Sequence, residues 1–153
     1  MCKMENKETL QELQKKIIQW AKEKDLLKLE NAPKQRLKLL EEVGETAGAI
    51  LKNNTDDIKD GIGDIFVVLV ILAEQLSEEI LFETYGVAKD NDEDFVFLFD
   101  NILNSNRLYF SLAYLNDICT KLNLDLTKCA NLAWDEIKDR KGNTIDGTFI
   151  KNN

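Results

Sequence analysis

Apolar residues recur along the first half of the chain at the three- and four-residue spacing of α-helices. Residues 7–24 carry one such stripe, made of Leu10, Leu13, Ile17, Ile18 and Ala21. A second helix is predicted from Pro33 to residue 52, because proline suits a first helical turn. Its expected apolar face consists of Leu39, Leu40, Val43, Ala47, Ile50 and Leu51.

A third helix is predicted over residues 57–77. Residues 65–73 are apolar without interruption and rich in β-branched side chains, so a strand is conceivable. A helix is favoured because the run joins its polar flanks without a turn signal, and a bundle needs an apolar helix at its centre. Glycine in a helix interior costs about 1 kcal/mol relative to alanine. Four of them therefore predict that the second and third helices cross closely: Gly44, Gly48, Gly61 and Gly63.

The second half of the chain alternates short apolar segments with polar ones. Residues 83–93 form the loosest region, and their acidic end resembles an EF-hand loop but has Phe95 where that loop needs glycine. Asp94 is expected to cap a short helix or an apolar connector over residues 95–103. Helices are expected over residues 106–122 and 126–140. The pair Asp146-Gly147 is typical of a hairpin turn, so the tail should form a small hairpin or an arm on a partner subunit.

These elements predict an all-α fold, a single helical bundle with a short extended tail or hairpin at its C-terminal end. The 153 residues fit one domain. Its expected core spans residues 7–78 and 106–142, with a variable connector over 79–105 and the tail over 143–153.

Charge and composition exclude several classes of partner and of catalytic site. The formal net charge is −8, which repels phosphate backbones and anionic lipids, so neither nucleic acid nor membrane is an expected partner. The start of the chain has no apolar signal core, and a cytoplasmic location is expected. The chain has no histidine, which excludes Ser-His and Cys-His catalysis. Three cysteines without a CxxC pair predict that Cys119 and Cys129 are small core residues in a reducing compartment.

The strongest chemical signal is the carboxylate group Glu41, Glu42 and Glu45. Spacings of three and four place these side chains on one side of a helix, where like charges repel unless water or a cation relieves them. Gln35 and Lys38 continue the same polar line toward the start of the helix. A solvated acidic face and a metal site both explain the pattern.

The position of Asp64 favours a metal site over a solvated acidic face. It directly precedes the apolar run of the third helix, where an unpaired carboxylate is costly to bury, and Asp60 lies one turn earlier. Oxygen ligands without histidine or cysteine select Mg²⁺, Mn²⁺ or Ca²⁺. Because Mg²⁺ takes substrate phosphates as further ligands, an acidic protein of this kind can bind a triphosphate.

Other residues are candidates for contact with a substrate. Lys138, Arg140 and Lys141 end the last predicted helix, where cations either complement the helix dipole or bind phosphate. Trp20, Asn116, Asn131 and Trp134 are candidates for contact with a base, because base pockets are built from aromatic and amide side chains.

Two parts of the chain resemble the MazG-like family of all-α nucleoside triphosphate pyrophosphohydrolases. The first is Gln35-x-x-Lys38-x-x-Glu41-Glu42-x-x-Glu45, followed at a distance by Gly63-Asp64 before an apolar helix. The second is the ending over residues 134–142, which is similar to that of short, phage-type members. The resemblance implies a helical bundle that forms homodimers or homotetramers. It also implies Mg²⁺-dependent, or Mn²⁺-dependent, cleavage of (d)NTP between the α and β phosphates, which gives (d)NMP and pyrophosphate.

By motif position, the resemblance implies that Glu42, Glu45 and Asp64 are metal ligands. Glu41 would be a further ligand or would orient the attacking water, and the phosphates would meet Lys38 and Arg140. The family's second motif is commonly ExxD, and its glutamate falls on Gly61 here. Asp60 is the expected replacement.

The departure at Gly61 keeps a second interpretation open. In it the chain is a catalytically weak or inactive relative, a helical oligomer that binds nucleotide or a protein partner as a sensor or scaffold. A third interpretation is a plain helical interaction module, whose acidic stripe is only solvated surface.

Overall fold

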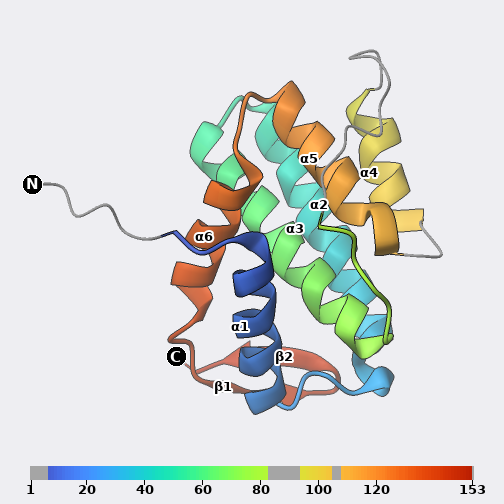
Figure 1. Cartoon of the computed structure of the whole chain (residues 1–153), viewed down its shortest axis with the longest axis vertical. Helices are drawn as coiled ribbons and strands as arrows, with labels where there is room; N and C mark the ends of the chain where they lie inside the picture. The colour runs from blue at the N-terminus through green and yellow to red at the C-terminus, as the bar shows by residue number, and fades with distance from the viewer. Residues whose placement is uncertain (1–6, 83–93, 105–107, 153) are drawn as a thin grey trace, which may run out of the picture.

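The computed structural model describes residues 7–82, 94–104 and 108–152, and in these ranges the chain is an α-helical bundle with one small hairpin (Figure 1). The elements follow in the order α1 Leu10–Glu23, η1 Leu29–Asn31, α2 Ala32–Leu51, α3 Thr55–Gln75, α4 Phe95–Asn104, η2 Leu108–Phe110, α5 Ser111–Lys121, α6 Leu126–Ile137, β1 Gly142–Ile145 and β2 Thr148–Lys151. The predicted all-α fold is confirmed. The loose region expected over residues 83–93 lies outside the described residues.

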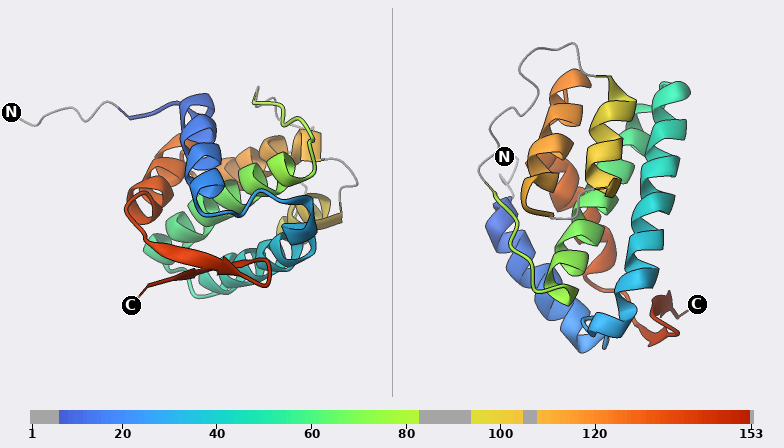
Figure 2. Two further views of the ribbon diagram at one scale, coloured as in Figure 1. Left: turned by 90° about the horizontal axis from the view of Figure 1, so that it is seen from below. Right: turned by 90° about the vertical axis from the view of Figure 1, so that its right-hand side faces the viewer.

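Helix α3 forms the centre of the molecule. Every residue from Ile65 to Ala73 is buried, and α3 packs against α1, α2, α5 and α6 (Figure 1). Helix α4 packs against α5 and α2, and the view from the side shows α2, α3, α4 and α5 running next to one another (Figure 2). The apolar run of residues 65–73 is therefore a core helix, as predicted. Cys119 and Cys129 are buried free thiols, which confirms their predicted place in the core.

Local side-chain hydrogen bonds fix where the helices begin. Asn54 accepts a hydrogen bond from the backbone N–H of Asp57 at 3.2 Å and so caps α3. Asp94 caps α4, as predicted, by accepting from the N–H of Phe97 at 2.8 Å. The same arrangement starts α6 at Asp125.

The glycines divide into two pairs. A Cβ at Gly61 would overlap the hydroxyl of Thr46 on α2, and one at Gly63 would overlap the carbonyl of Cys129 on α6. These two glycines let α3 approach both neighbours closely. Gly44 and Gly48 have open space around them, so the prediction that they also mark a close crossing is wrong. Gly44 is exposed, and Gly48 is half-buried at the edge of a hollow between α2 and α3.

The buried side of α2 differs from the predicted apolar face. It includes the polar residues Gln35, Glu42 and Thr46 together with Leu39 and Val43. Leu40 and Leu51, predicted inside, are 52% and 85% exposed. Two members of the polar line, Gln35 and Glu42, thus face the interior, while Glu45 stays exposed and two leucines of the predicted apolar face lie at the surface. Leu132 of α6, also predicted inside, is 46% exposed.

The C-terminal tail forms the predicted hairpin. Strands β1 and β2 pair antiparallel with Ile145 opposite Thr148, and the turn between them is Asp146-Gly147. Gly147 has a φ of 81°, a conformation that other residues rarely adopt. The hydroxyl of Thr144 donates to the backbone carbonyl of Lys24 at 2.6 Å, which ties the hairpin to the end of α1. The hairpin thus crosses one end of the bundle (Figure 2).

None of the described helices combines the length and hydrophobicity that crossing a membrane requires.

Candidate functional site

The acidic residues of α2 lie together, as their spacing predicts. Carboxylate oxygens of Glu41, Glu42 and Glu45 lie within 4.8 Å of one another, close enough to share one cation. The ammonium group of Lys38 contacts Glu41 at 2.6 Å and Glu42 at 3.1 Å. Burial acts to lower the pKa of Lys38, but the hydrogen bonds to these two carboxylates raise it above its ordinary value. Lys38 is therefore a firmly charged ammonium at the edge of the acidic group.

Glu42 is the buried member of this group. Its residue is only 6% exposed, and its Oε2 atom has no hydrogen-bond partner among the described residues. Burial raises the pKa of Glu42, Lys38 opposes the shift, and the charges of Glu45 and Glu41 add to it. An ionised oxygen without a partner is costly inside a protein. The buried Oε2 atom of Glu42 would therefore be stabilised by a second cation in addition to Lys38.

Asp64 meets this group from the facing helix, α3. Burial, followed by the negative charges of Glu42, Glu136 and Asp60, raises its pKa to about 7, while Arg140 opposes the shift. Asp64, which the sequence singles out as a metal ligand with the acids of α2, is half-buried and lines the same hollow as Glu42. Such a strongly perturbed carboxyl is typical of a functional site.

Asp64 lies between two hollows of the surface. The first has a volume of about 420 Å³ and is enclosed by α1, α2, α3, the end of α6 and the hairpin. Its polar end has Gln35, Lys38, Glu42 and Arg140 beside Asp64. Its apolar end is lined by the side chains of Trp20, Val67, Val68, Ile71 and Phe149. We call this the mixed hollow.

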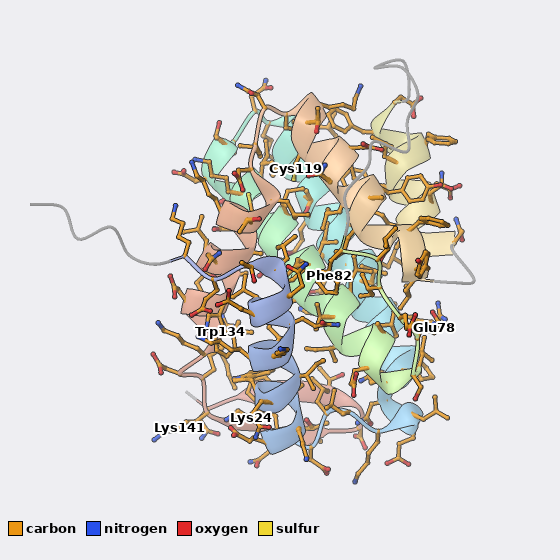
Figure 3. The ribbon with its side chains drawn as sticks, viewed as in Figure 1. Lys24, Glu78, Phe82, Cys119, Trp134 and Lys141 are labelled. Carbon is orange, nitrogen blue, oxygen red and sulfur yellow. The ribbon has the colours of Figure 1, made fainter. Side chains whose placement is uncertain are left out.

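Two aromatic rings form one wall of the mixed hollow. Trp20 and Phe149 meet edge to face with ring centroids 5.0 Å apart, and Lys24 lies 5.9 Å from the Trp20 ring. Lys24 and Lys141 both lie at the hairpin end of the molecule (Figure 3). The indole N–H of Trp20 is buried and has no acceptor among the described residues.

The second hollow, of about 490 Å³, lies on the other side of Asp64. We call it the acidic hollow, because its charged lining is mostly carboxylate: Glu45, Asp57, Asp60, Asp64 and Glu136, with Lys52 as the cation. Asp60, the predicted replacement for the missing glutamate, thus lies in the hollow that Asp64 also lines. Glu136 comes from α6 and was not predicted.

The predicted basic cluster at the end of α6 does not stay together. Arg140 lines the mixed hollow. Lys138 lines a different hollow and forms an ion pair with Asp135 at 3.2 Å. Lys141 is exposed in the segment that leads to β1. Of the three cations, only Arg140 is placed next to Asp64.

Sequence reasoning missed Glu136 and Phe149. They are separated from Asp64 by more than seventy residues, and neither has a local spacing that marks it. The one available signal was the segment from Trp134 to Gly142, which contains Glu136 but stands out by its cations.

The donor set suits a hard divalent cation. Only carboxylate oxygens are gathered here, and one of them, Oε2 of Glu42, is buried without a partner. Glu42, Glu45 and Asp64 would hold such an ion, with Glu41 and Asp60 beside them. Waters or phosphate oxygens would complete its coordination.

Comparison with known proteins supports the same family. Residues 32–93 match the family model of the MazG nucleotide pyrophosphohydrolase domain. The resemblance to the MazG family is confirmed. The matched segment contains α2 and α3, and therefore Glu41, Glu42, Glu45, Asp60 and Asp64. Arg140, Glu136 and Phe149 lie outside it.

Part of the chain also has a counterpart in a bacteriophage. Over 66 residues the chain is 52% identical to the "uncharacterized 18.2 kDa protein in rep-hol intergenic region" of Haemophilus phage HP1 (strain HP1c1). The aligned part is 43% of this chain and 40% of the phage protein, so the chain spans about two fifths of that relative's length. No solved structure is significantly similar to the chain.

Proposed function

We propose that the chain is an Mg²⁺-dependent nucleoside triphosphate pyrophosphohydrolase, which converts a (d)NTP to the (d)NMP and pyrophosphate. The observation that carries the proposal is the group of Glu42, Glu45 and Asp64 on two facing helices of the MazG segment. One of these carboxylates is buried with an unpartnered oxygen. Mn²⁺ fits the same oxygen ligands.

In this proposal, the metal ion, the cationic side chains and Glu41 have different roles in the reaction. When bound, the divalent ion supplies positive charge to the phosphates and lowers the pKa of a water molecule. Lys38 and Arg140 bind phosphate oxygens at the polar end of the mixed hollow, and Gln35 lies beside them. Glu41 is exposed next to the acidic group, where it is placed to orient the attacking water and accept its proton. No covalent nucleophile is needed.

The apolar end of the mixed hollow suits the nucleoside. Trp20 and Phe149 give a base an aromatic wall, and Val67 and Val68 line the same space from α3. The triphosphate then extends toward Asp64 and Arg140. Lys138 and Lys141, which the sequence suggested as substrate contacts, are not part of this arrangement.

The test of the site is the variant Glu45→Ala. Losing one metal ligand should lower turnover at least about 100-fold, while the circular dichroism spectrum stays helical because Glu45 is exposed. Glu74→Ala is the matched control, since Glu74 is an exposed glutamate in the last turn of α3. Full activity of Glu45→Ala would refute the site assignment.

A second candidate function is favoured by Gly61, where no glutamate can fit beside Thr46. In that case the chain binds nucleotide as a catalytically weak or inactive oligomeric scaffold. Mg²⁺ plus nucleotide would then raise the melting temperature without forming product.

We also propose that the functional unit is a homo-oligomer, a dimer or tetramer. Helix α2 exposes an apolar line made of Leu37, Leu40, Gly44 and Leu51. Gly44 leaves open space on this line, which allows a second helix to approach closely.

A further inference from the structure

The C-terminal hairpin turns one face toward the bundle. Among the residues of its two strands, Gly142, Thr144 and Phe149 are half-buried and the others are exposed. Thr144 lies directly opposite Phe149 in the ladder. The backbone N–H of Asn152 donates to the carbonyl of Lys141 at 2.7 Å, and counting back from this bond makes Thr144 and Phe149 a pair without mutual backbone hydrogen bonds. Side chains in such a pair are closest to each other, so the position of Thr144 governs that of the Phe149 ring.

Both of these residues contact the last turn of α1. The hydroxyl of Thr144 donates to the carbonyl of Lys24, the C-cap residue, at 2.6 Å. The ring of Phe149 meets that of Trp20, which lies one turn before Lys24 in the same helix. A two-stranded hairpin is marginally stable by itself in water. Its place on the bundle therefore depends on contacts such as these two.

The turn of the hairpin lies against α2. A Cβ at Gly147 would come 3.0 Å from the Cγ atom of Lys34, near the start of that helix. The hairpin thus reaches from the end of α1 to the start of α2, across one end of the bundle (Figure 2). Residues 147–151 line the mixed hollow there, so the placement of the hairpin decides the shape of its apolar end.

Trp20 brings a polar group without a partner to the apolar end of the mixed hollow. The residue is only 7% exposed, and its indole N–H has no acceptor among the described residues. A buried donor without an acceptor is costly. A ligand that brings both a flat ring and hydrogen-bond acceptors therefore suits this end of the hollow, and a nucleobase has both.

We propose that Thr144 is a positioning residue for the nucleoside. Its bond to the end of α1 holds the hairpin so that the ring of Phe149 closes the apolar end of the mixed hollow beside a bound base. The inference rests on the proposed function for the class of ligand, a nucleoside triphosphate, but not on turnover. It assigns part of the affinity for the nucleoside to the hairpin, which lies outside the MazG segment of residues 32–93.

The experiment measures binding by isothermal titration calorimetry in the presence of Mg²⁺. The ligands are the α,β-imido analogues of the canonical dNTPs and of dUTP, in which nitrogen replaces the oxygen between the α and β phosphates and prevents cleavage there. Inorganic tripolyphosphate is the comparison, because it has the phosphates and no nucleoside. Thr144→Val removes the hydroxyl and keeps the shape of the side chain. We expect it to weaken binding of the tightest analogue about 3- to 10-fold and to leave tripolyphosphate binding unchanged.

Three further variants separate positioning from a general loss of stability. Thr144→Ser keeps the hydroxyl and should bind as the wild type does. Thr120→Val is the matched control, since Thr120 is exposed on α5 and its hydroxyl also donates to a backbone carbonyl, that of Asn116, at 3.0 Å. In Phe149→Ala, which has no ring to position, the addition of Thr144→Val should have no further effect on binding.

The proposal is overturned if Thr144→Val binds the analogue as tightly as the wild type, or loses tripolyphosphate to the same extent. A loss in Thr144→Ser as large as in Thr144→Val, or full additivity with Phe149→Ala, overturns it as well. The same holds if no analogue binds more tightly than tripolyphosphate. If the analogue binds as expected but the wild type hydrolyses no natural nucleotide, the proposed function is refuted and this inference stands.

Discussion

At the scale of single residues, the most informative group is Asp64. Its carboxyl lies between the two hollows, and burial followed by the charge of Glu42 raises its pKa to about 7. The sequence singled out Asp64, because a carboxylate that borders an all-apolar helix is unusual. The shift of its pKa was not predictable, since it depends on burial, on the charges of Glu42 and Glu136 from two other helices, and on Arg140, which follows α6.

The raised pKa predicts how stability depends on pH in the absence of metal. Below about pH 4 Asp64 is largely protonated in both the folded and the unfolded chain, so its ionisation contributes nothing to stability. Between about pH 4 and 7 the unfolded carboxyl ionises while the folded one resists, so its contribution to stability becomes unfavourable as pH rises. Asp64→Asn should therefore stabilise the metal-free protein at pH 8 by on the order of 1–2 kcal/mol, allowing for partial exposure, and have little effect at pH 4.

Urea unfolding at both pH values in the presence of a chelator measures this difference. Asp56→Asn is the control, because Asp56 is exposed at the start of α3. An equal effect of Asp64→Asn at pH 4 and pH 8 would contradict the assignment.

At the scale of elements, the site depends on how closely α3 approaches its neighbours. The sequence predicted the helices and most of their ends, because capping residues and apolar spacing are local signals. It did not predict which side of α2 is buried: Gln35, Glu42 and Thr46 face the interior, and Leu40 is exposed. The buried side depends on what α2 packs against, and the sequence of one helix does not specify its neighbours. The hairpin was predicted from Asp146-Gly147, but its role as a wall of the mixed hollow was not.

The close approach is tested by Gly61→Ala. The added methyl would overlap Thr46, so the substitution should destabilise the protein by about 1–3 kcal/mol. Gly44→Ala is the control on α2, where nothing of the same chain lies within 4 Å. With Leu40 and Leu51 both replaced by lysine, so that the proposed interface is removed, it should be neutral or stabilise by up to about 1 kcal/mol. Thermal unfolding followed by circular dichroism compares the two. If both variants melt at the same temperature, Gly61 does not mark a tight crossing.

At the scale of the whole molecule, the exposed apolar line of α2 predicts self-association. Replacing Leu40 and Leu51 together by lysine should convert the oligomer to a monomer while the fold is kept, since both side chains are already more than half exposed. Leu132→Lys on α6 controls for the loss of an exposed leucine elsewhere. Light scattering coupled to size-exclusion chromatography gives the mass. A monomeric wild type, or a double variant that remains oligomeric, would show that this line is not the interface.

The central claim is the reaction, and identification of the products tests it most directly. The wild type is incubated with the canonical NTPs and dNTPs and with dUTP, with and without Mg²⁺, and the mono-, di- and triphosphates are separated. The account predicts a nucleoside monophosphate and pyrophosphate, formed only with the metal, because the carboxylates of Glu42, Glu45 and Asp64 repel the phosphates unless a divalent ion bound by them offsets their charge. A diphosphate and inorganic phosphate, products without metal, or no product across the panel would contradict it.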